Sequence, residues 1–192
     1  MKKLCILISM LSTLTITAQN KKTPVKFVAA ITSDIEKVAK DYFNHFQNIK
    51  GEQISETNNI IEYNSKIIPQ GAIESTIMKI KSLDNSYSWE ALMLDTEDFN
   101  NAVAKYRQLY RQLNGARLYL DDDKSYKLKG VYDAPDEARG FASSLLGVEV
   151  HEKALQQFKI EIALNYTMPE WSVKIYVYEK EDDEDIRPTV NN

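Results

Sequence analysis

The chain has two histidines, the side chains on which nucleophilic catalysis most often depends. A Ser-His-Asp site needs a hydroxyl, an imidazole and a carboxylate brought together. His45 lies at the edge of an apolar stripe in a predicted helix and His151 follows a short Val-Glu-Val run, but the chain lacks a G-x-S-x-G motif. Two isolated histidines, with Cys5 as the single cysteine, also form no recognisable zinc ligand set. We interpret both histidines as structural or surface residues and predict no catalytic residue, metal site or cofactor.

Acidic side chains offer two further chemistries. Asp121, Asp122 and Asp123 supply oxygens that a hard cation could use, but the EF-hand alternation and its later glutamate are missing. A polar turn is the favoured interpretation of this run. A glycosidase-like pair of carboxylates stays open as an alternative, because only the separation of two acids in space identifies such a pair.

Basic residues gather on or just beyond the second predicted helix. Lys105, Arg107, Arg111 and Arg117 form a patch that could contact an anion or a partner. The alternative is a solvated helix face. We retain Lys105, Arg107 and Arg111 as candidate partner contacts.

Tyrosines are the second group of candidate partner contacts. Tyrosine combines an apolar ring with a polar tip, which suits both interfaces and ligand clefts. Strands also favour aromatic residues for packing alone, so this is the alternative interpretation. Of the tyrosines near predicted strands, we retain Tyr176 and Tyr178. The group consists of Tyr119, Tyr126, Tyr132, Tyr166, Tyr176 and Tyr178.

The N-terminus has the organisation of a signal peptide, which we assign to residues 1–18. Lys2 and Lys3 supply the positive end, residues 4–17 form an apolar run, and Ala18 is a small residue suited to the cleavage position. The run is shorter than the roughly 20 residues that span a bilayer, so a retained anchor is the weaker alternative. We expect an exported protein that starts near Gln19 and has no stable membrane insertion. The periplasm is the favoured location, with secretion or the cell surface as alternatives.

Cleavage would also change the composition. It would remove Cys5, so stability would come from a packed core without disulfides. Of the 24 basic side chains, Lys2 and Lys3 would be lost, leaving 22 against 28 acidic ones and a formal charge of −6. A domain of this charge is a poor nucleic-acid binder, so we expect no nucleic-acid partner.

Two stretches of the chain resemble each other at a shift of 64 residues, from position 33 to position 97. Asp34 and Asp98, Tyr42 and Tyr106, and Gly51 and Gly115 are identical pairs. Such self-similarity indicates a duplicated supersecondary unit. Around Trp89 and Trp171 a second likeness has a shift of 82, so the later copy carries 18 more residues.

Each copy predicts one amphipathic helix. Ser33 and Glu36 fit a capping box, so we expect the first helix to begin there and to end at Gly51. The second begins after Asp98 and ends at Gly115. Apolar side chains recur in both at spacings of three and four, giving each helix one face to bury. The first stripe is Ile35, Val38, Ala39, Tyr42, Phe46 and Ile49, and the second is Phe99, Ala102, Val103, Tyr106, Tyr110 and Leu113.

The remaining periodicity predicts strands. Residues 75–81 and 87–94 form a hairpin, and residues 158–164 and 171–178 form its counterpart. Residues 25–31, 59–63 and 126–132 are weaker strand candidates, and residues 133–147 include a short predicted helix. We expect one face of the sheet to be covered by the helices and the other face to be more exposed to solvent. The side chains expected to face the helices are Met78, Ile80, Trp89, Ile160, Ile162 and Trp171.

The predicted fold class is α+β: an antiparallel sheet with two long helices packed on it, built from a duplicated strand-helix-hairpin unit. The alternative is a secretion-chaperone-like or TATA-binding-protein-like arrangement. We divide the chain into a linker at 19–24, one domain at 25–180 made of repeats at about 25–85 and 86–180, and an acidic disordered tail at 181–192.

A short leader, a body without cysteine and a duplicated unit resemble, in general style, small exported proteins of unknown function from Bacteroidota-type bacteria. This resemblance implies no activity. We therefore expect a non-enzymatic binding or interaction module of the cell envelope, whose partner is an envelope protein, a glycan or a small ligand. The alternative is a carboxylate-dependent hydrolase that acts on an envelope polymer.

Overall fold

The computed structural model describes residues 26–81, 86–120, 124–150 and 153–180. The predicted leader, linker and tail, together with Asp121 to Asp123 and His151, lie outside these residues. The helices are α1 (Lys26–Tyr42), α2 (Phe99–Leu113), the short 3-10 helix η1 (Glu137–Arg139) and α3 (Lys153–Gln157). The strands are β1 (Lys50–Glu56), β2 (Ile60–Ser65), β3 (Glu74–Ile80), β4 (Tyr87–Thr96), β5 (Arg117–Tyr119), β6 (Ser125–Gly130), β7 (Phe141–Val148), β8 (Phe158–Thr167) and β9 (Glu170–Glu179).

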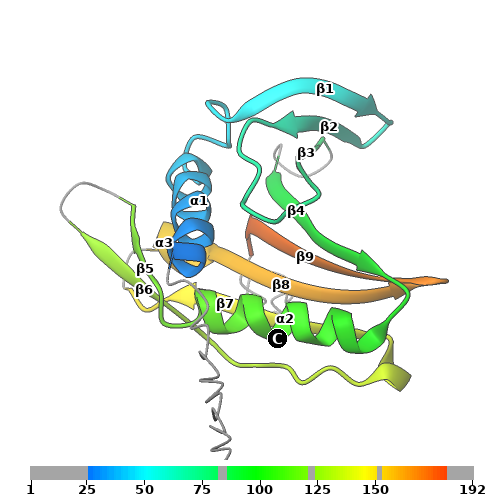
Figure 1. Cartoon of the computed structure of the whole chain (residues 1–192). Coiled ribbons are helices and arrows are strands. Elements are labelled where there is room, and N and C mark those ends of the chain that lie inside the picture. Colours follow the sequence, from blue (N-terminus) through cyan, green and yellow to red (C-terminus); the bar gives the residue numbers. More distant parts are fainter. Residues whose placement is uncertain (1–25, 82–85, 121–123, 151–152, 181–192) are drawn as a thin grey trace, which may run out of the picture.

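One antiparallel sheet of nine strands dominates the molecule (Figure 1). Its order is β1-β2-β3-β4-β9-β8-β7-β6-β5, so two meanders meet where β4 pairs with β9. Helix α2 connects the meanders by crossing from the middle of the sheet to its far edge. In the described part of the chain, no helix is both long and apolar enough to cross a bilayer.

The predicted fold class is wrong. The structure is mostly a nine-stranded antiparallel sheet accompanied by three short α-helices, instead of two long helices packed on a sheet. The expected strand-helix-hairpin unit is also wrong, because each of α1 and α2 is followed by a longer meander. The secretion-chaperone-like and TATA-binding-protein-like alternatives, which belong to the same prediction, are wrong as well.

The core lies between one face of the sheet and the helices α1 and α2. Trp89 of β4 and Val177 of β9 are paired neighbours, and both are fully buried on this face. The ring of Tyr42 in α1 packs edge-on against the ring of Phe158. The hydroxyl groups of Tyr106 in α2 and Ser144 are hydrogen-bonded to each other, with 2.6 Å between the oxygens. We call the opposite side of the sheet the open face.

Helix α1 differs from its prediction at both ends. It begins at Lys26 and runs through the expected cap at Ser33, and Ile31 extends the buried stripe by one turn, so the strand predicted at 25–31 is wrong. The helix ends at Tyr42 because the chain then turns. The carboxylate of Asp41 accepts hydrogen bonds from the backbone N–H groups of Asn48 and Ile49 at 2.9 and 3.2 Å, which stabilises that turn.

The two predicted helix stops behave differently. Gly51 lies inside β1, so it does not end a helix. Gly115 adopts a left-handed φ of +86° directly after α2 and its cap, as predicted. Residues 133–147 were wrongly predicted to include a helix that carries Phe141 and Leu145, because only the single turn η1 forms before β7. In β7 alternate residues are buried, and this pattern belongs to a strand.

Both predicted hairpins are confirmed as the pairs β3/β4 and β8/β9, and the weaker candidates at 59–63 and 126–132 are confirmed as β2 and β6. One detail of the first hairpin is wrong. Ile77, opposite Trp89, is the fully buried hydrophobic residue of β3, so Met78 and Ile80 face the other side of the sheet. Side chains alternate along a strand, so an error of one residue in the predicted register moves every side chain to the opposite face of the sheet.

Candidate functional site

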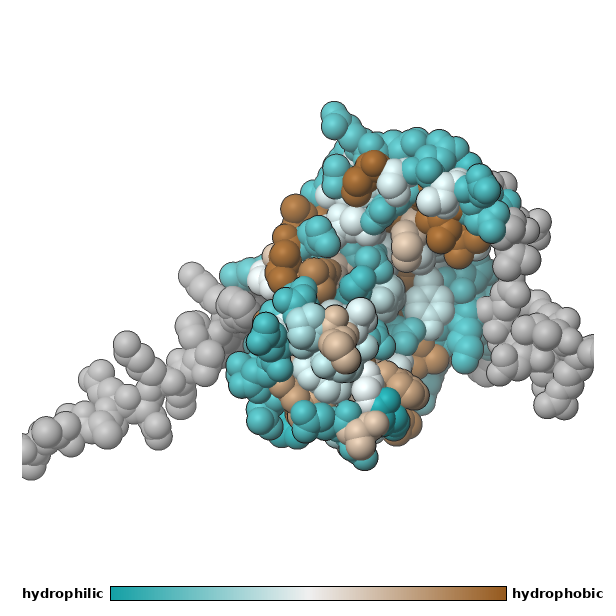
Figure 2. Space-filling model, turned by 90° about the vertical axis from the view of Figure 1, so that its right-hand side faces the viewer, coloured by the Kyte–Doolittle hydropathy of each residue, from teal (hydrophilic) through white to brown (hydrophobic). Residues whose placement is uncertain are grey.

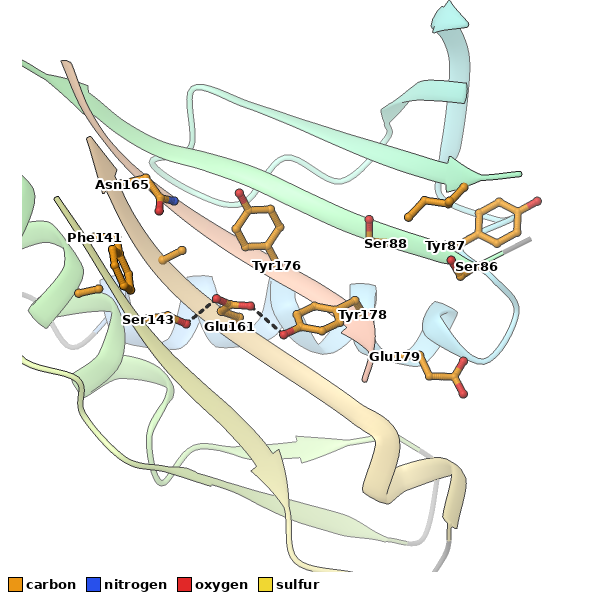
Figure 3. Close-up of a pocket in the computed structure, with 13 residues that line it drawn as sticks. Ser86, Tyr87, Ser88, Phe141, Ser143, Glu161, Asn165, Tyr176, Tyr178 and Glu179 are labelled. Atoms are coloured by element: carbon orange, nitrogen blue, oxygen red, sulfur yellow. Dashed lines mark hydrogen bonds between the residues drawn. The ribbon is translucent and has the colours of Figure 1, made fainter. Parts of the chain in front are cut away.

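The open face of the sheet contains a hollow of about 600 Å³, which we call the Glu161 hollow (Figure 3). It is lined by Ile80, Ser86, Tyr87, Ser88, Phe141, Ala142, Ser143, Glu161, Ala163, Asn165, Tyr176, Tyr178 and Glu179. Ile80 comes from β3 and Phe141 from β7, although β4, β9 and β8 lie between these strands. The open face is therefore concave here.

Strand register brings the polar side chains of the hollow together. Glu161 of β8 lies opposite Tyr176 of β9, and Ser143 of β7 lies opposite Ala163 of β8. Because side chains alternate along each strand, Ser143, Glu161 and Tyr178 point from three neighbouring strands toward the same side of the sheet. Glu161 and Tyr178 have paired neighbours on both adjacent strands, whereas Ser143 is paired with β8 on one side and donates its backbone N–H to Asp133 at 3.0 Å.

Glu161 is the centre of this arrangement. Its Oε2 accepts a hydrogen bond of 2.7 Å from the Tyr178 hydroxyl, and its Oε1 accepts one from the Ser143 hydroxyl. Both donors are neutral, so they orient the carboxylate without cancelling its charge. Figure 3 shows the three side chains in a line across the strands.

Tyr176 and Tyr178, two of the three tyrosines that line the hollow, keep their protons at physiological pH. Burial, followed by the charges of Glu90 and Glu161, raises the pKa of Tyr176 to about 12. Burial and the contact with Glu161 raise the pKa of Tyr178 still further. Their hydroxyls are therefore neutral donors, and neither tyrosine is poised to act as a base.

A neighbouring ion pair occupies the next part of the open face. Lys174 Nζ lies 3.1 Å from Glu90 Oε1, and both side chains are largely buried. Glu90 is the cross-strand neighbour of Tyr176, so this pair stands beside the hollow. Among the described residues that line the hollow itself, none is a lysine, arginine or histidine.

The structure separates the residues predicted as partner contacts. Tyr176 and Tyr178 line the hollow, whereas Lys105, Arg107 and Arg111 lie on α2, which packs against the opposite face. Arg107 and Arg111 are exposed, while Lys105 is half-buried and its pKa is lowered by that burial. The five residues therefore do not form one site.

The other candidates lie apart from the hollow's carboxylate. Arg117 is on the edge strand β5 and donates a hydrogen bond to Ser125 at 3.1 Å. His45 is exposed, with its ring 5.4 Å from that of Tyr87. Within the described ranges, no group of three or more acidic, histidine or cysteine side chains could hold a metal ion.

Sequence reasoning missed Ser143, Glu161 and Phe141. A signal for Glu161 was present, since the alternation of Ile160 and Ile162 already placed it on the wetter face of a predicted strand. Ser143 and Phe141 had no such signal, because their segment was interpreted as a helix. The chemistry that the hollow offers is recognition: an oriented carboxylate, neutral hydroxyls and aromatic rings around an open space.

Comparisons with known proteins do not add an identity. No family model matches the chain, and neither a curated protein nor a solved structure does so.

Proposed function

We propose that the protein is an exported, non-enzymatic binding module of the cell envelope, and that the Glu161 hollow holds a small ligand. The observation that carries this proposal is the combination of a concave, mainly apolar and aromatic lining with a few polar groups that are already hydrogen-bonded in place. Small-molecule sites in proteins have this character.

The face of the molecule drawn in Figure 2 supports a small ligand more than a large docking partner. In the view of Figure 2, hydrophobic residues form separate brown patches divided by hydrophilic ones, and the surface is hollowed between its upper and lower parts. Large protein interfaces more often present one contiguous apolar patch.

Binding is also better supported than hydrolysis. A glycosidase of the usual kind needs two carboxyl groups that flank the scissile bond. Of the described residues lining the hollow, the acids are Glu161 and Glu179. Glu179 is exposed at the end of β9, and Figure 3 shows its carboxylate directed away from Glu161. We therefore do not assign a catalytic pair to this hollow.

A fluorescent probe tests the proposal. The uncharged fluorophore N-phenyl-1-naphthylamine should brighten when it is titrated with the purified protein, because it enters a mainly apolar site. Ala163→Leu places a larger side chain in the hollow and should weaken this binding several-fold. Gln108→Leu, on the exposed side of α2, is the matched control and should leave it unchanged.

Two results would contradict the proposal. One is that the probe does not bind the native protein. The other is that Ala163→Leu binds it as well as Gln108→Leu does, with both variants folded by circular dichroism.

A further inference from the structure

The charge of the Glu161 hollow is not balanced by its own lining. Glu161 receives hydrogen bonds from Ser143 and Tyr178, both neutral, and the carboxylate of the other lining acid, Glu179, is directed away from it. Two nearby cations are already paired with acids: Lys174 with Glu90 at 3.1 Å, and Arg139 with Asp133 at 2.6 Å. The Arg139 guanidinium lies over one face of the Phe141 ring, 5.0 Å from its centroid. A mainly apolar hollow with a carboxylate in its floor favours a ligand that carries a positive charge.

Aromatic rings surround the same carboxylate. Tyr176 is the cross-strand neighbour of Glu161, Tyr178 donates to it, and Phe141 lines the hollow one strand away. Figure 3 shows these rings on both sides of Glu161. Aromatic faces attract ammonium groups, and the attraction grows when the cation is withdrawn from water.

The tyrosines also keep the hollow selective. The raised pKa of Tyr176, to about 12, follows from burial and from the charges of Glu90 and Glu161. The part of this shift that comes from the two carboxylates also disfavours an anionic ligand, whereas the larger part, burial, disfavours an ion of either sign.

From this arrangement we propose that the ligand of the Glu161 hollow is a small organic cation: an ammonium group attached to a short apolar body. The ammonium group contacts the Glu161 carboxylate and the rings of Tyr176 and Phe141. The apolar body lies beside Ala163, the cross-strand neighbour of Ser143. This inference rests on the proposed binding function and specifies its ligand class.

Four probes with the same six-carbon chain test it: hexyltrimethylammonium, hexylammonium, hexanol and hexanoate. Dissociation constants are measured by ligand-observed NMR titration with the purified protein. We expect both cations to bind about tenfold or more tightly than hexanol, from the combined carboxylate and cation–π contacts, and hexanoate to bind most weakly.

Substitutions assign the preference to the hollow. Glu161→Gln keeps the shape and most hydrogen bonds but removes the charge, so it should abolish the preference for cations while hexanol binding stays the same. Glu137→Gln removes an equal charge from the exposed helix η1 and should leave the preference intact. Phe141→Leu keeps the apolar character but removes a ring, and should weaken hexyltrimethylammonium more than hexanol; it tests the site even if Glu161→Gln does not fold.

The outcomes separate the two proposals. If hexanol and N-phenyl-1-naphthylamine bind but the cations are not preferred, the ligand class is wrong and the binding function stands. The ligand class is also wrong if Glu161→Gln and Glu137→Gln retain the same preference. If none of the probes binds, both proposals fail.

Discussion

Tyr178 donates a 2.7 Å hydrogen bond to the carboxylate of Glu161, its diagonal neighbour on the adjacent strand. The bond joins β8 and β9 on the open face, whereas Ile160 and Ile162 of β8 and Val177 of β9 fill the core on the other side. One hairpin thus contributes to the core and positions the charged group of the hollow.

Tyr178→Phe should lower the free energy of unfolding by about 1 kcal/mol, because Glu161 Oε2 loses its donor. Urea denaturation followed by tryptophan fluorescence measures the change. Tyr176→Phe is the matched control on the same strand, since the Tyr176 hydroxyl has no hydrogen-bond partner among the described residues. Equal losses in both variants would show that the Tyr178 bond contributes nothing specific.

Ser65→Ala should destabilise the protein by about 1–3 kcal/mol, because the indole N–H of the fully buried Trp89 would lose its acceptor. In the native structure Trp89 Nε1 donates to Ser65 Oγ at 3.0 Å. Ser55→Ala, on the exposed strand β1, serves as the control and should change stability by less than about 0.5 kcal/mol. Stability is measured by urea denaturation. If Ser65→Ala and Ser55→Ala unfold at the same urea concentration, the hydrogen bond from Trp89 to Ser65 does not stabilise the protein.

Gly130→Ala should cost more than about 2 kcal/mol, since nearby backbone would have to move. A Cβ at position 130 would lie 2.1 Å from the carbonyl oxygen of Leu145. Gly147→Ala, on the paired strand β7, is a close control because its Cβ would meet only the Lys159 side chain, at 3.5 Å. Thermal unfolding of both variants checks the prediction, which fails if Gly130→Ala is the more stable of the two.

Asp133→Asn should lower stability at neutral pH and have little effect in strong acid. The hydrogen bond from Arg139, followed by one from the Ser143 N–H, holds the pKa of Asp133 below its usual value. The stability from this group is therefore present above the unfolded pKa of about 3.9 and is lost as the pH falls through the lowered folded value.

The size of this effect should be below about 1 kcal/mol, since the side chains of Asp133 and Arg139 are about one-third exposed, at 34% and 36%. Urea unfolding of both proteins between pH 2 and 7 measures it. A difference that stays constant across the whole range would show that the ion pair is not its source.

Export remains a prediction from the sequence. We expect the protein recovered from the cell envelope to begin at Gln19, because a positive end, an apolar run and Ala18 together form a cleavable leader. N-terminal sequencing decides this. Recovery of an intact Met1 end in the membrane pellet would overturn it.

The sequence by itself determined the elements whose pattern is local. Ile160, Ile162 and Trp171 were correctly predicted to face the helices, and the apolar stripe of α2 correctly predicted a helix that ends before Gly115. Such patterns are readable because periods of 2 and 3.6 residues follow from backbone geometry alone.

Short or weakly periodic segments were decided by the tertiary structure. Residues 25–31 could form a strand or a helix, and packing of Ile31 in line with Ile35 accompanies the placement of residues 26–31 in α1. The face of Met78 and Ile80 depended on pairing Ile77 with Trp89. Local preferences in these segments are weak, so burial against distant parts of the chain determines the outcome.

The hollow also required the tertiary structure. Glu161, Tyr176 and Tyr178 come from one hairpin, but Ser143 and Phe141 reach them only because β7 pairs with β8, and Ile80 only because β4 pairs with β9. Pairing between strands far apart in sequence is set by burial of the whole sheet against α1 and α2, which no local pattern encodes. The sequence therefore specified the two central hairpins, whereas the concave face and its central carboxylate arose only when the two meanders joined.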